Sequence, residues 1–330
     1  MLDVNYEARL ARLLLPHISD FMLIDVGASG GIHPLWGQLE PVLRAHGFEP
    51  DENEVDRLNK LQANDRVRYH AAFVTSTDEM VAEGKQTDGL FNTHCFELTS
   101  ARRAATAFSR RAQGAGEAVS AAPRFSERKT SVDSFCGTAG VAQVDFIKID
   151  TDGYDYYVLR GAERTLRERG VLGVQVECPL HGTPHALANV FSNIDQFMRQ
   201  MGFALFSTDV WRYSRAGLPS PFFYDIPAQT RTGQVQWLDA LYVLDPLTRT
   251  DLFETLDGAQ LAKVLMLYDL YGLPDCAATL ITEMQRRGLA LAGVDFDKAL
   301  DLLAPGGDHE AYLARFDEDP AAFYPSNFKR

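Results

Sequence analysis

The sequence predicts an α/β protein built on a doubly wound, mostly parallel seven-stranded sheet, with a C-terminal helical appendage. Two observations carry this prediction. Short apolar segments alternate with segments of helical periodicity from residue 21 to about residue 207, and this alternation is typical of a parallel sheet with helices on both faces. The stretch after Pro246 contains helical patterns separated by glycine and proline, without further strand patterns.

Each element of the α/β pattern has its own local signal. Seven apolar segments have the length and composition of strands: residues 22–26, 45–49, 67–74, 144–150, 172–177, 203–206 and 236–244. Four segments between them have helical periodicity: residues 35–45, 51–62, 154–169 and 191–201. Asp51 stands where it can cap the second of these helices, since aspartate is a preferred N-cap residue.

The pattern divides the chain into three parts. Residues 1–20 predict a short amphipathic helix and not a secretion signal, because acids occur early and the apolar block is short. Residues 21–246 form the α/β domain, and residues 247–330 predict about three further helices. Residues 99–126 are an insertion with five arginines and one glutamate. This insertion is a candidate lid over an anionic ligand, although a solvated helical face explains the same pattern.

Composition excludes several classes of protein. The 330 residues carry a net charge of −13, which disfavours a nucleic-acid-binding protein because the phosphate backbone would be repelled. No apolar run approaches the length of a membrane span. The four cysteines are scattered without a C-x-x-C pair, which favours reduced thiols and a cytoplasmic location over disulfides or a zinc site.

The turn after the first strand predicts a cofactor site. It contains three glycines, at positions 27, 30 and 31, and ligands of doubly wound sheets bind at such strand ends. The spacing does not match the G-x-G-x-x-G turn of dinucleotide sites. Asp25 ends the strand, and an acid there suits a cationic ligand such as S-adenosylmethionine better than a pyrophosphate. Glu49 follows the second strand, and a carboxylate about 20 residues beyond the turn is suited to bind ribose hydroxyls. Helix capping is the alternative role for both acids.

Four stretches together resemble the FkbM family of class I methyltransferases, which have a Rossmann-like fold. They are "LIDVGASGG", "GFEPDEN", "VDFIKIDTDGYDYYVLRGAERTL" and "VQVECPLHG". The resemblance covers residues 22–180 and extends towards residue 244; the family has glutamate where this chain has Asp152. It implies an S-adenosylmethionine-dependent O-methyltransferase that acts on a hydroxyl group of a sugar-like or secondary-metabolite acceptor. The candidate cofactor-binding residues are Asp25, Gly27, Ala28, Ser29, Gly31, Glu49, Pro50 and Ala72.

Methyl transfer to a hydroxyl group requires a base that accepts the hydroxyl proton. Asp150 and His181 are the candidates, with Glu177 as an acceptor that orients the substrate hydroxyls. Lys148 lies in an otherwise apolar strand, so it should pair with one of these acids, because an unpaired buried ammonium is costly. The same region offers a less favoured divalent-metal site with these ligands: Asp150, Asp152, Glu177 and His181.

Two other functions remain alternatives to a methyltransferase. One is a nicotinamide-dependent oxidoreductase, and the other is a non-catalytic scaffold that retains the methyltransferase fold. The expected partner is a small-molecule or carbohydrate acceptor, anionic if the arginine-rich insertion contacts it. The apolar faces of the C-terminal helices suit packing on the sheet domain or formation of a homodimer.

Overall fold

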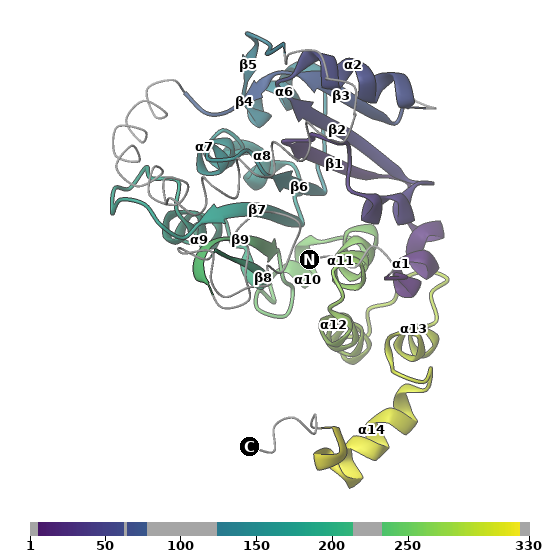
Figure 1. Ribbon diagram of the computed structural model, residues 1–330. Coiled ribbons are helices and arrows are strands. Elements are labelled where there is room, and N and C mark those ends of the chain that lie inside the picture. The colour runs from purple at the N-terminus through teal and green to yellow at the C-terminus, as the bar shows by residue number, and fades with distance from the viewer. Residues whose placement is uncertain (1–5, 63–64, 78–123, 214–232, 324–330) are drawn as a thin grey trace, which may run out of the picture. The chain divides into compact units, whose positions relative to one another are not determined.

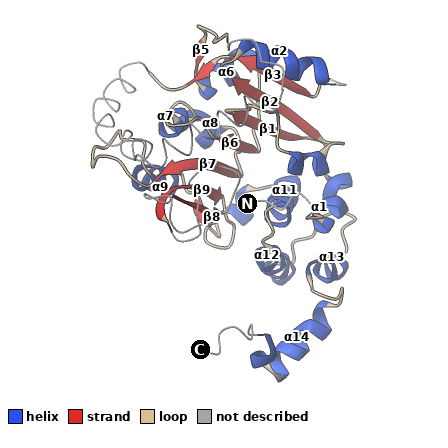
Figure 2. Ribbon diagram, in the orientation of Figure 1, coloured by secondary structure: helices blue, strands red, loops and turns tan. Residues whose placement is uncertain are grey.

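Seven strands form one sheet in this computed structural model (Figures 1 and 2), in the order β3-β2-β1-β6-β7-β9-β8. The structure describes residues 6–62, 65–77, 124–213 and 233–323. The strands are β1 (Phe21–Val26), β2 (Leu43–Glu49), β3 (Val67–Ala71), β6 (Phe146–Ile149), β7 (Gly173–Pro179), β8 (Ala204–Tyr213) and β9 (Gln234–Val243). β6 pairs in parallel with β1 and β7, whereas β9 is antiparallel to β7 and β8. The predicted doubly wound, mostly parallel sheet is confirmed.

Four helices between residues 132 and 200 cover one face of the sheet. They are α6 (Val132–Ala139), α7 (Asp155–Arg160), α8 (Glu163–Glu168) and α9 (Phe191–Gln200). Their apolar side chains, such as Phe135, Leu159 and Phe197, form one core cluster with alternate strand residues that include Ile24 and Ile147. Alternation along a strand sends the intervening residues to the other face. That face of β1 and β6 therefore carries Asp25 and Lys148, which belong to the candidate site described below.

α2 (Glu52–Leu61) begins as predicted, with the Asp51 side chain accepting a hydrogen bond from the Asn53 amide at 3.0 Å. Its apolar residues Val55 and Leu58 form a smaller core cluster with Ala28 and Tyr69. The helix therefore packs beside the turn that follows β1.

Several local predictions differ from the structure. The expected helix over residues 35–45 is a 3-10 helix, η2 (Pro34–Leu39), and β2 begins at Leu43. Pro41 explains the early end, because proline lacks the N–H that a continuing helix needs. The third predicted strand divides into β3 and a separate β4 (Phe73–Val74), which pairs with β5 (Lys129–Thr130).

The predicted helix over residues 154–169 divides into α7 and α8 at Gly161. A side chain at Gly161 could not be accommodated, because a Cβ atom there would lie 2.3 Å from the carbonyl oxygen of Thr75. Asp133 then caps the new helix, since its carboxylate accepts hydrogen bonds from the amides of Arg164 and Thr165 at 3.0 and 2.7 Å. The close approach of Gly161 to Thr75 therefore places the end of α7 directly against the residues that follow β4.

A second unit comprises residues 1–21, 33–43 and 245–330, and the sheet unit comprises residues 22–32 and 44–244. Its helices are α1 (Arg9–Leu14), η1 (Leu15–His17), η2, α10 (Leu252–Thr255), α11 (Gly258–Leu270), α12 (Pro274–Arg286), α13 (Phe296–Leu303), α14 (His309–Glu318) and η3 (Pro320–Phe323). Asp269 of the buried helix α11 accepts hydrogen bonds from the Tyr6 hydroxyl and the Ala11 amide at 2.8 and 2.9 Å, which ties the N-terminal segment to it. The domain boundaries at residues 21 and 246 stay a sequence-based prediction.

The described residues contain no candidate for a membrane-spanning helix. None of the helices there combines the length and the apolar character that crossing a bilayer requires. The three described cysteines, Cys136, Cys178 and Cys276, are free thiols.

Candidate functional site

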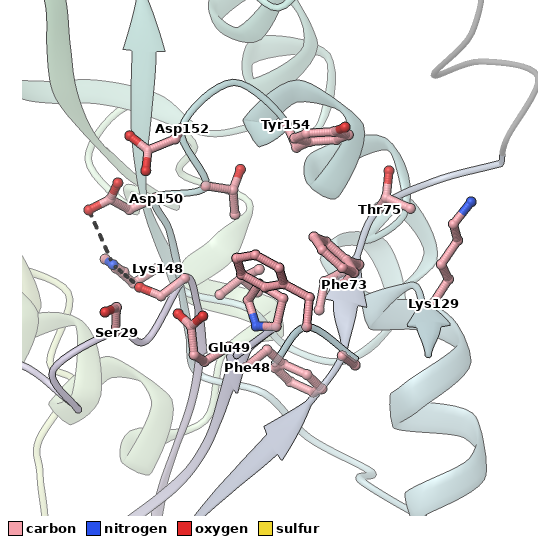
Figure 3. A pocket seen from close by; sticks show the side chains of 17 residues that line it. Ser29, Phe48, Glu49, Phe73, Thr75, Lys129, Lys148, Asp150, Asp152 and Tyr154 are labelled. Atoms are coloured by element: carbon pink, nitrogen blue, oxygen red, sulfur yellow. Dashed lines mark hydrogen bonds and ion pairs between the residues drawn. The ribbon is translucent and has the colours of Figure 1, made fainter. Parts of the chain in front are cut away.

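A cavity of about 700 Å³ opens in the sheet unit where β1, β2 and β6 end (Figure 3). Its walls include Gly27 after β1, Glu49 at the end of β2 and Asp150 after β6. This is the edge of a doubly wound sheet at which ligands bind. The volume lies within the range of small-molecule sites, about 300–1,000 Å³.

The glycine turn brings β1 into contact with the loop after β6. Gly27 has φ of 82°, and a Cβ atom at this position would lie 1.7 Å from the carbonyl oxygen of Asp150. The amides of Gly27 and Ala28 both donate to the Phe48 carbonyl oxygen at 2.9 Å. Glycine is therefore required at position 27, and the turn is fixed to the end of β2 as well as to β6.

Lys148 joins two carboxylates beneath the cavity. Its Nζ atom lies 3.4 Å from Oδ1 of Asp25 and 3.4 Å from Oδ2 of Asp150, and it donates to the Gly27 carbonyl oxygen at 3.1 Å. Burial raises the pKa of Asp25 to about 6, although the Lys148 charge opposes this shift. Burial alone would lower the pKa of Lys148, but Asp25 and Asp150 outweigh it and raise that pKa. At neutral pH Asp25 and Lys148 therefore form an ion pair.

Glu49 places a buried carboxylate on the cavity wall. The residue is 9% exposed, and its Oε1 atom accepts a hydrogen bond from the Asp51 amide at 2.9 Å. Burial raises the pKa of Glu49, and the nearby Asp51, Glu54 and Asp152 charges add to the effect. One carboxylate oxygen thus has a protein partner, and the side chain faces the cavity (Figure 3).

Two exposed aromatic rings stand at the other side of the cavity. Phe73 and Phe125 both line it, with ring centroids 6.3 Å apart and planes inclined at 44°. They are 39% and 58% exposed, which is unusual for phenylalanine. Phe125 is held there by its antiparallel bridge to Asp51, next to a hydrogen bond from the Ser126 amide to the Pro50 carbonyl oxygen.

The loop after β6 has a strained conformation. Asp152 has φ of 52°, the left-handed region that non-glycine residues rarely adopt. The buried Asp155 holds the loop, because its Oδ1 atom accepts from the amide and hydroxyl of Thr151 at 2.8 and 2.9 Å. Asn189 donates to the other oxygen of Asp155 at 3.2 Å. Asp150 and Asp152 are therefore presented to the cavity from a fixed turn (Figure 3).

A row of acids crosses three neighbouring strands. Glu177 on β7 is opposite Asp239 on β9, which is opposite Asp209 on β8. Burial and surrounding acids, Asp155 first among them, raise the pKa of Glu177 to about 9. Burial likewise raises the pKa of Asp239 to about 6, although Trp211 opposes this shift by donating to Asp239 at 2.8 Å. Glu177 is therefore protonated at neutral pH.

Comparison with known protein families identifies the chain. The model of the methyltransferase FkbM domain matches residues 25–205, more than half of the 330 residues. The chain belongs to the FkbM methyltransferase family. It is accordingly an S-adenosylmethionine-dependent methyltransferase, and the match confirms the family expected from the four sequence stretches. It also decides against the nicotinamide-dependent alternative.

Solved structures similar to this FkbM methyltransferase are distant. A putative S-adenosylmethionine-dependent methyltransferase from Listeria monocytogenes is 9% identical, with a TM-score of 0.34; the match covers 72% of this chain and 99% of that one. A TehB-like methyltransferase from Corynebacterium glutamicum is 11% identical, with a TM-score of 0.28 and coverage of 71% and 86%. Geranyl diphosphate C-methyltransferase from Streptomyces coelicolor is 12% identical, with a TM-score of 0.34 and coverage of 72% and 77%. No curated protein sequence matches significantly.

The structure brings part of the predicted site of this methyltransferase together. Of the residues expected to bind the cofactor, the cavity is lined by Gly27, Ser29, Glu49, Pro50 and Ala72. Asp25, Ala28 and Gly31 are not among the lining residues. Asp25 is 2% exposed and lies under the cavity beside Lys148. The predicted pairing of Lys148 with an acid is present, with Asp150 on one side and Asp25 on the other.

Of the four candidates for catalysis, two line the cavity and two do not. Lys148 and Asp150 line it, but Glu177 and His181 do not. His181 Nε2 lies 2.6 Å from the Val235 carbonyl oxygen and 3.3 Å from Gln234 Nε2. Sequence reasoning missed Tyr154, Phe73 and Phe125 as lining residues. The proposed arginine lid over residues 99–126 lies outside the described residues, except for its last three.

The metal hypothesis finds no support in the described part of the chain. No group of three or more histidine, cysteine, aspartate or glutamate side chains there is arranged to hold a metal ion. His181 is instead engaged with β9, as described above.

Proposed function

We propose that this FkbM methyltransferase transfers a methyl group from S-adenosylmethionine, bound in the 700 Å³ cavity, to a hydroxyl group of a sugar-like or secondary-metabolite acceptor. The observation that carries the proposal is the placement of Glu49. Its buried carboxylate faces the cavity between the glycine turn and the β6 loop. A carboxylate at the end of the second strand is suited to accept hydrogen bonds from two adjacent ribose hydroxyls.

Phe73 and Phe125 are suited to hold the adenine ring. Their centroids lie 6.3 Å apart and their planes are inclined at 44°, so the rings must move slightly apart and turn parallel to accept a planar base, because non-bonded carbon atoms approach to about 3.5–4.0 Å. Both rings are exposed, and Phe73 lies across the cavity from Asp150 and Asp152 (Figure 3). The adenine and ribose ends of the cofactor would then be fixed by β2, β4 and the segment around Phe125.

The cofactor supplies a methyl group on a positively charged sulfur atom, so alignment accounts for much of the catalysis. The chain must orient the acceptor hydroxyl and remove its proton. With S-adenosylmethionine bound, the acceptor oxygen would take the methyl carbon, the electrons of the broken carbon–sulfur bond would stay on sulfur, and a base of the chain would accept the hydroxyl proton. We assign the base to Asp150, because its side chain lines the cavity and is 47% exposed.

Lys148 and Glu177 support this step in different ways. Lys148 holds Asp150 by its charge at 3.4 Å, which fixes the base next to the turn. Glu177, protonated at neutral pH because of its raised pKa, does not line the cavity, so it would donate a hydrogen bond only to an acceptor that extends beyond the cavity towards β7. The sequence alone predicts that this residue accepts hydrogen bonds from the substrate hydroxyls. His181 is the second choice for the base.

Methyl transfer from deuterium-labelled S-adenosylmethionine tests the acceptor class. The acceptor panel contains sugars and phenols together with their matched amino and thiol analogues, and products are detected by mass spectrometry. We expect label on hydroxyl compounds and a loss of at least about 100-fold in rate for Asp150→Asn, with Asp65→Asn, an exposed surface change, as the control. Transfer to amino or thiol analogues alone would contradict O-methylation while leaving the methyltransferase assignment intact.

A further inference from the structure

A second cavity, of about 370 Å³, lies next to the cofactor cavity in the sheet unit. The two cavities share Thr75 and Lys129 as lining residues. Figure 3 shows both residues on the side of the first cavity opposite Asp150. The second cavity is therefore separate from the proposed site of methyl transfer.

Three chain segments form the walls of this second cavity. They are the residues after β4, the start of α6 with the strand before it, and the end of α7. Backbone contacts fix them to one another: the Thr75 amide donates to the Thr130 carbonyl oxygen at 2.9 Å, and the Asp133 amide donates to the Gly161 carbonyl oxygen at 3.0 Å. The close approach of Gly161 to Thr75 described above closes the third side. The cavity is thus bounded by a rigid frame.

Buried polar atoms without partners are concentrated here. Four such side-chain atoms occur among the described residues, and three of them belong to residues that line this cavity: Thr75 Oγ1, Ser76 Oγ and Arg160 Nε. Thr75 is only 7% exposed. Nearly all buried polar groups in proteins have a hydrogen-bond partner, and those without one commonly indicate water or an ion at the site. Hydroxyl and guanidinium groups together are donors that suit an anion.

The charges of the lining residues also favour an anion. Lys129 and Arg160 provide two positive charges, and Asp133 is the one acid among the residues that line the cavity. The Asp133 carboxylate is occupied by the amides of Arg164 and Thr165 and by the Thr165 hydroxyl at 2.7–3.0 Å. The Arg160 guanidinium lies over the Phe197 ring, 5.2 Å from its centroid, and its ion pair with Glu163 is long, at 4.0 Å. The long ion pair leaves this guanidinium able to turn towards a ligand.

We propose that this cavity, lined by Thr75, Ser76, Lys129, Ser131 and Arg160, binds a tetrahedral oxyanion, a phosphate or sulfate group, next to the cofactor site. Arginine and hydroxyl groups are the usual partners of such oxygens, and arginine can engage two of them at once. The group is either a free ion or part of a larger phosphorylated or sulfated ligand. The second case would make the cavity a specificity pocket of the methyltransferase.

Calorimetric titration of the full chain with inorganic phosphate tests the proposal, with ionic strength held constant by sodium chloride. Glycerol 1-phosphate is titrated in parallel: tighter binding of the ester assigns the site to a phosphorylated ligand, and equal binding assigns it to the free ion. We expect saturable binding of phosphate, weakened at least about tenfold in Arg160→Gln and about three- to tenfold in Ser76→Ala.

Arg167→Gln is the matched control, because Arg167 pairs with the same Glu163 at 3.2 Å but does not line the cavity. The proposal is overturned if the wild-type protein binds neither anion, or if Arg167→Gln weakens binding as much as Arg160→Gln does. S-adenosylhomocysteine is titrated into the same variants. Loss of phosphate binding with unchanged cofactor affinity separates this site from the proposed function.

Discussion

The ammonium group of Lys148 lies 3.4 Å from the carboxylate of Asp25, across the paired strands β6 and β1. Asp25 is almost fully buried and does not line the cavity, so Lys148 stands between its charge and the cavity. The sequence suggested a direct contact between Asp25 and a cationic cofactor. The structure instead gives a buried ion cluster that carries Asp150 at its exposed end.

Removing the cation from this cluster should destabilise the protein. Lys148→Met leaves Asp25 buried without a counter-charge, and we expect a loss of about 3 kcal/mol in the free energy of unfolding, measured with urea. Asp25→Asn in the same protein should restore part of the loss, because it removes the uncompensated charge. Lys60→Met, at an exposed position of α2, serves as the control. Equal stability of Lys148→Met and the wild-type protein would contradict the account of the cluster.

The aromatic pair should contribute to cofactor affinity. Phe125→Ala removes one of the two rings proposed to hold adenine, and we expect about tenfold weaker binding of S-adenosylhomocysteine, since stacking of a base on an aromatic ring contributes about 1–3 kcal/mol. Leu61→Ala, another exposed apolar position in the same unit, should leave affinity unchanged. Unaltered affinity of Phe125→Ala would show that adenine binds elsewhere.

Glu177 should behave as a neutral acid. Its pKa of about 9 lies above the value of about 4.5 in the unfolded chain, so folding at pH 7 requires proton uptake and its cost grows as the pH rises towards 9. Glu177→Gln avoids that cost, and we expect a gain of about 3 kcal/mol at pH 7 that vanishes near pH 4. Thermal denaturation at the two pH values measures the difference. A destabilised Glu177→Gln protein at pH 7 would mean that the carboxylate is ionised there.

Two paired histidines should make stability fall in acid. His46 Nδ1 and His70 Nε2 lie 3.1 Å apart between β2 and β3. Burial lowers the pKa of both rings, that of His70 to about 4, with the neighbouring arginine charges adding to the effect. The unfolded chain binds these protons from about pH 6.5 downwards, so stability is lost as the pH falls from 6.5 to 4. His70→Gln should flatten this part of the curve of melting temperature against pH; an unchanged slope would exclude the pair as its origin.

The strands and the turn that position the site were predictable from the sequence, because the sequence patterns of these elements are local. The apolar run of β1, the glycine turn and Glu49 at the end of β2 each follow from a few neighbouring residues. Phe125 was not predictable, because it reaches the cavity through a bridge to Asp51, which lies far away in the sequence. The Asp25–Lys148 contact likewise depends on the register of two strands separated by more than 100 residues. Long-range pairing of this kind leaves no signal in a single sequence.

The central claim is that Glu49 binds the ribose of S-adenosylmethionine in the cavity at the ends of β1, β2 and β6. Titration calorimetry with S-adenosylhomocysteine tests it most directly, on the wild-type protein, Glu49→Gln and the exposed α2 control Asp56→Asn. We predict saturable binding by the wild type and by Asp56→Asn, and affinity reduced about 10- to 100-fold in Glu49→Gln, because hydrogen bonds to a charged acceptor are lost. Absence of binding by the wild-type protein, or equal affinity of Glu49→Gln, would contradict the claim.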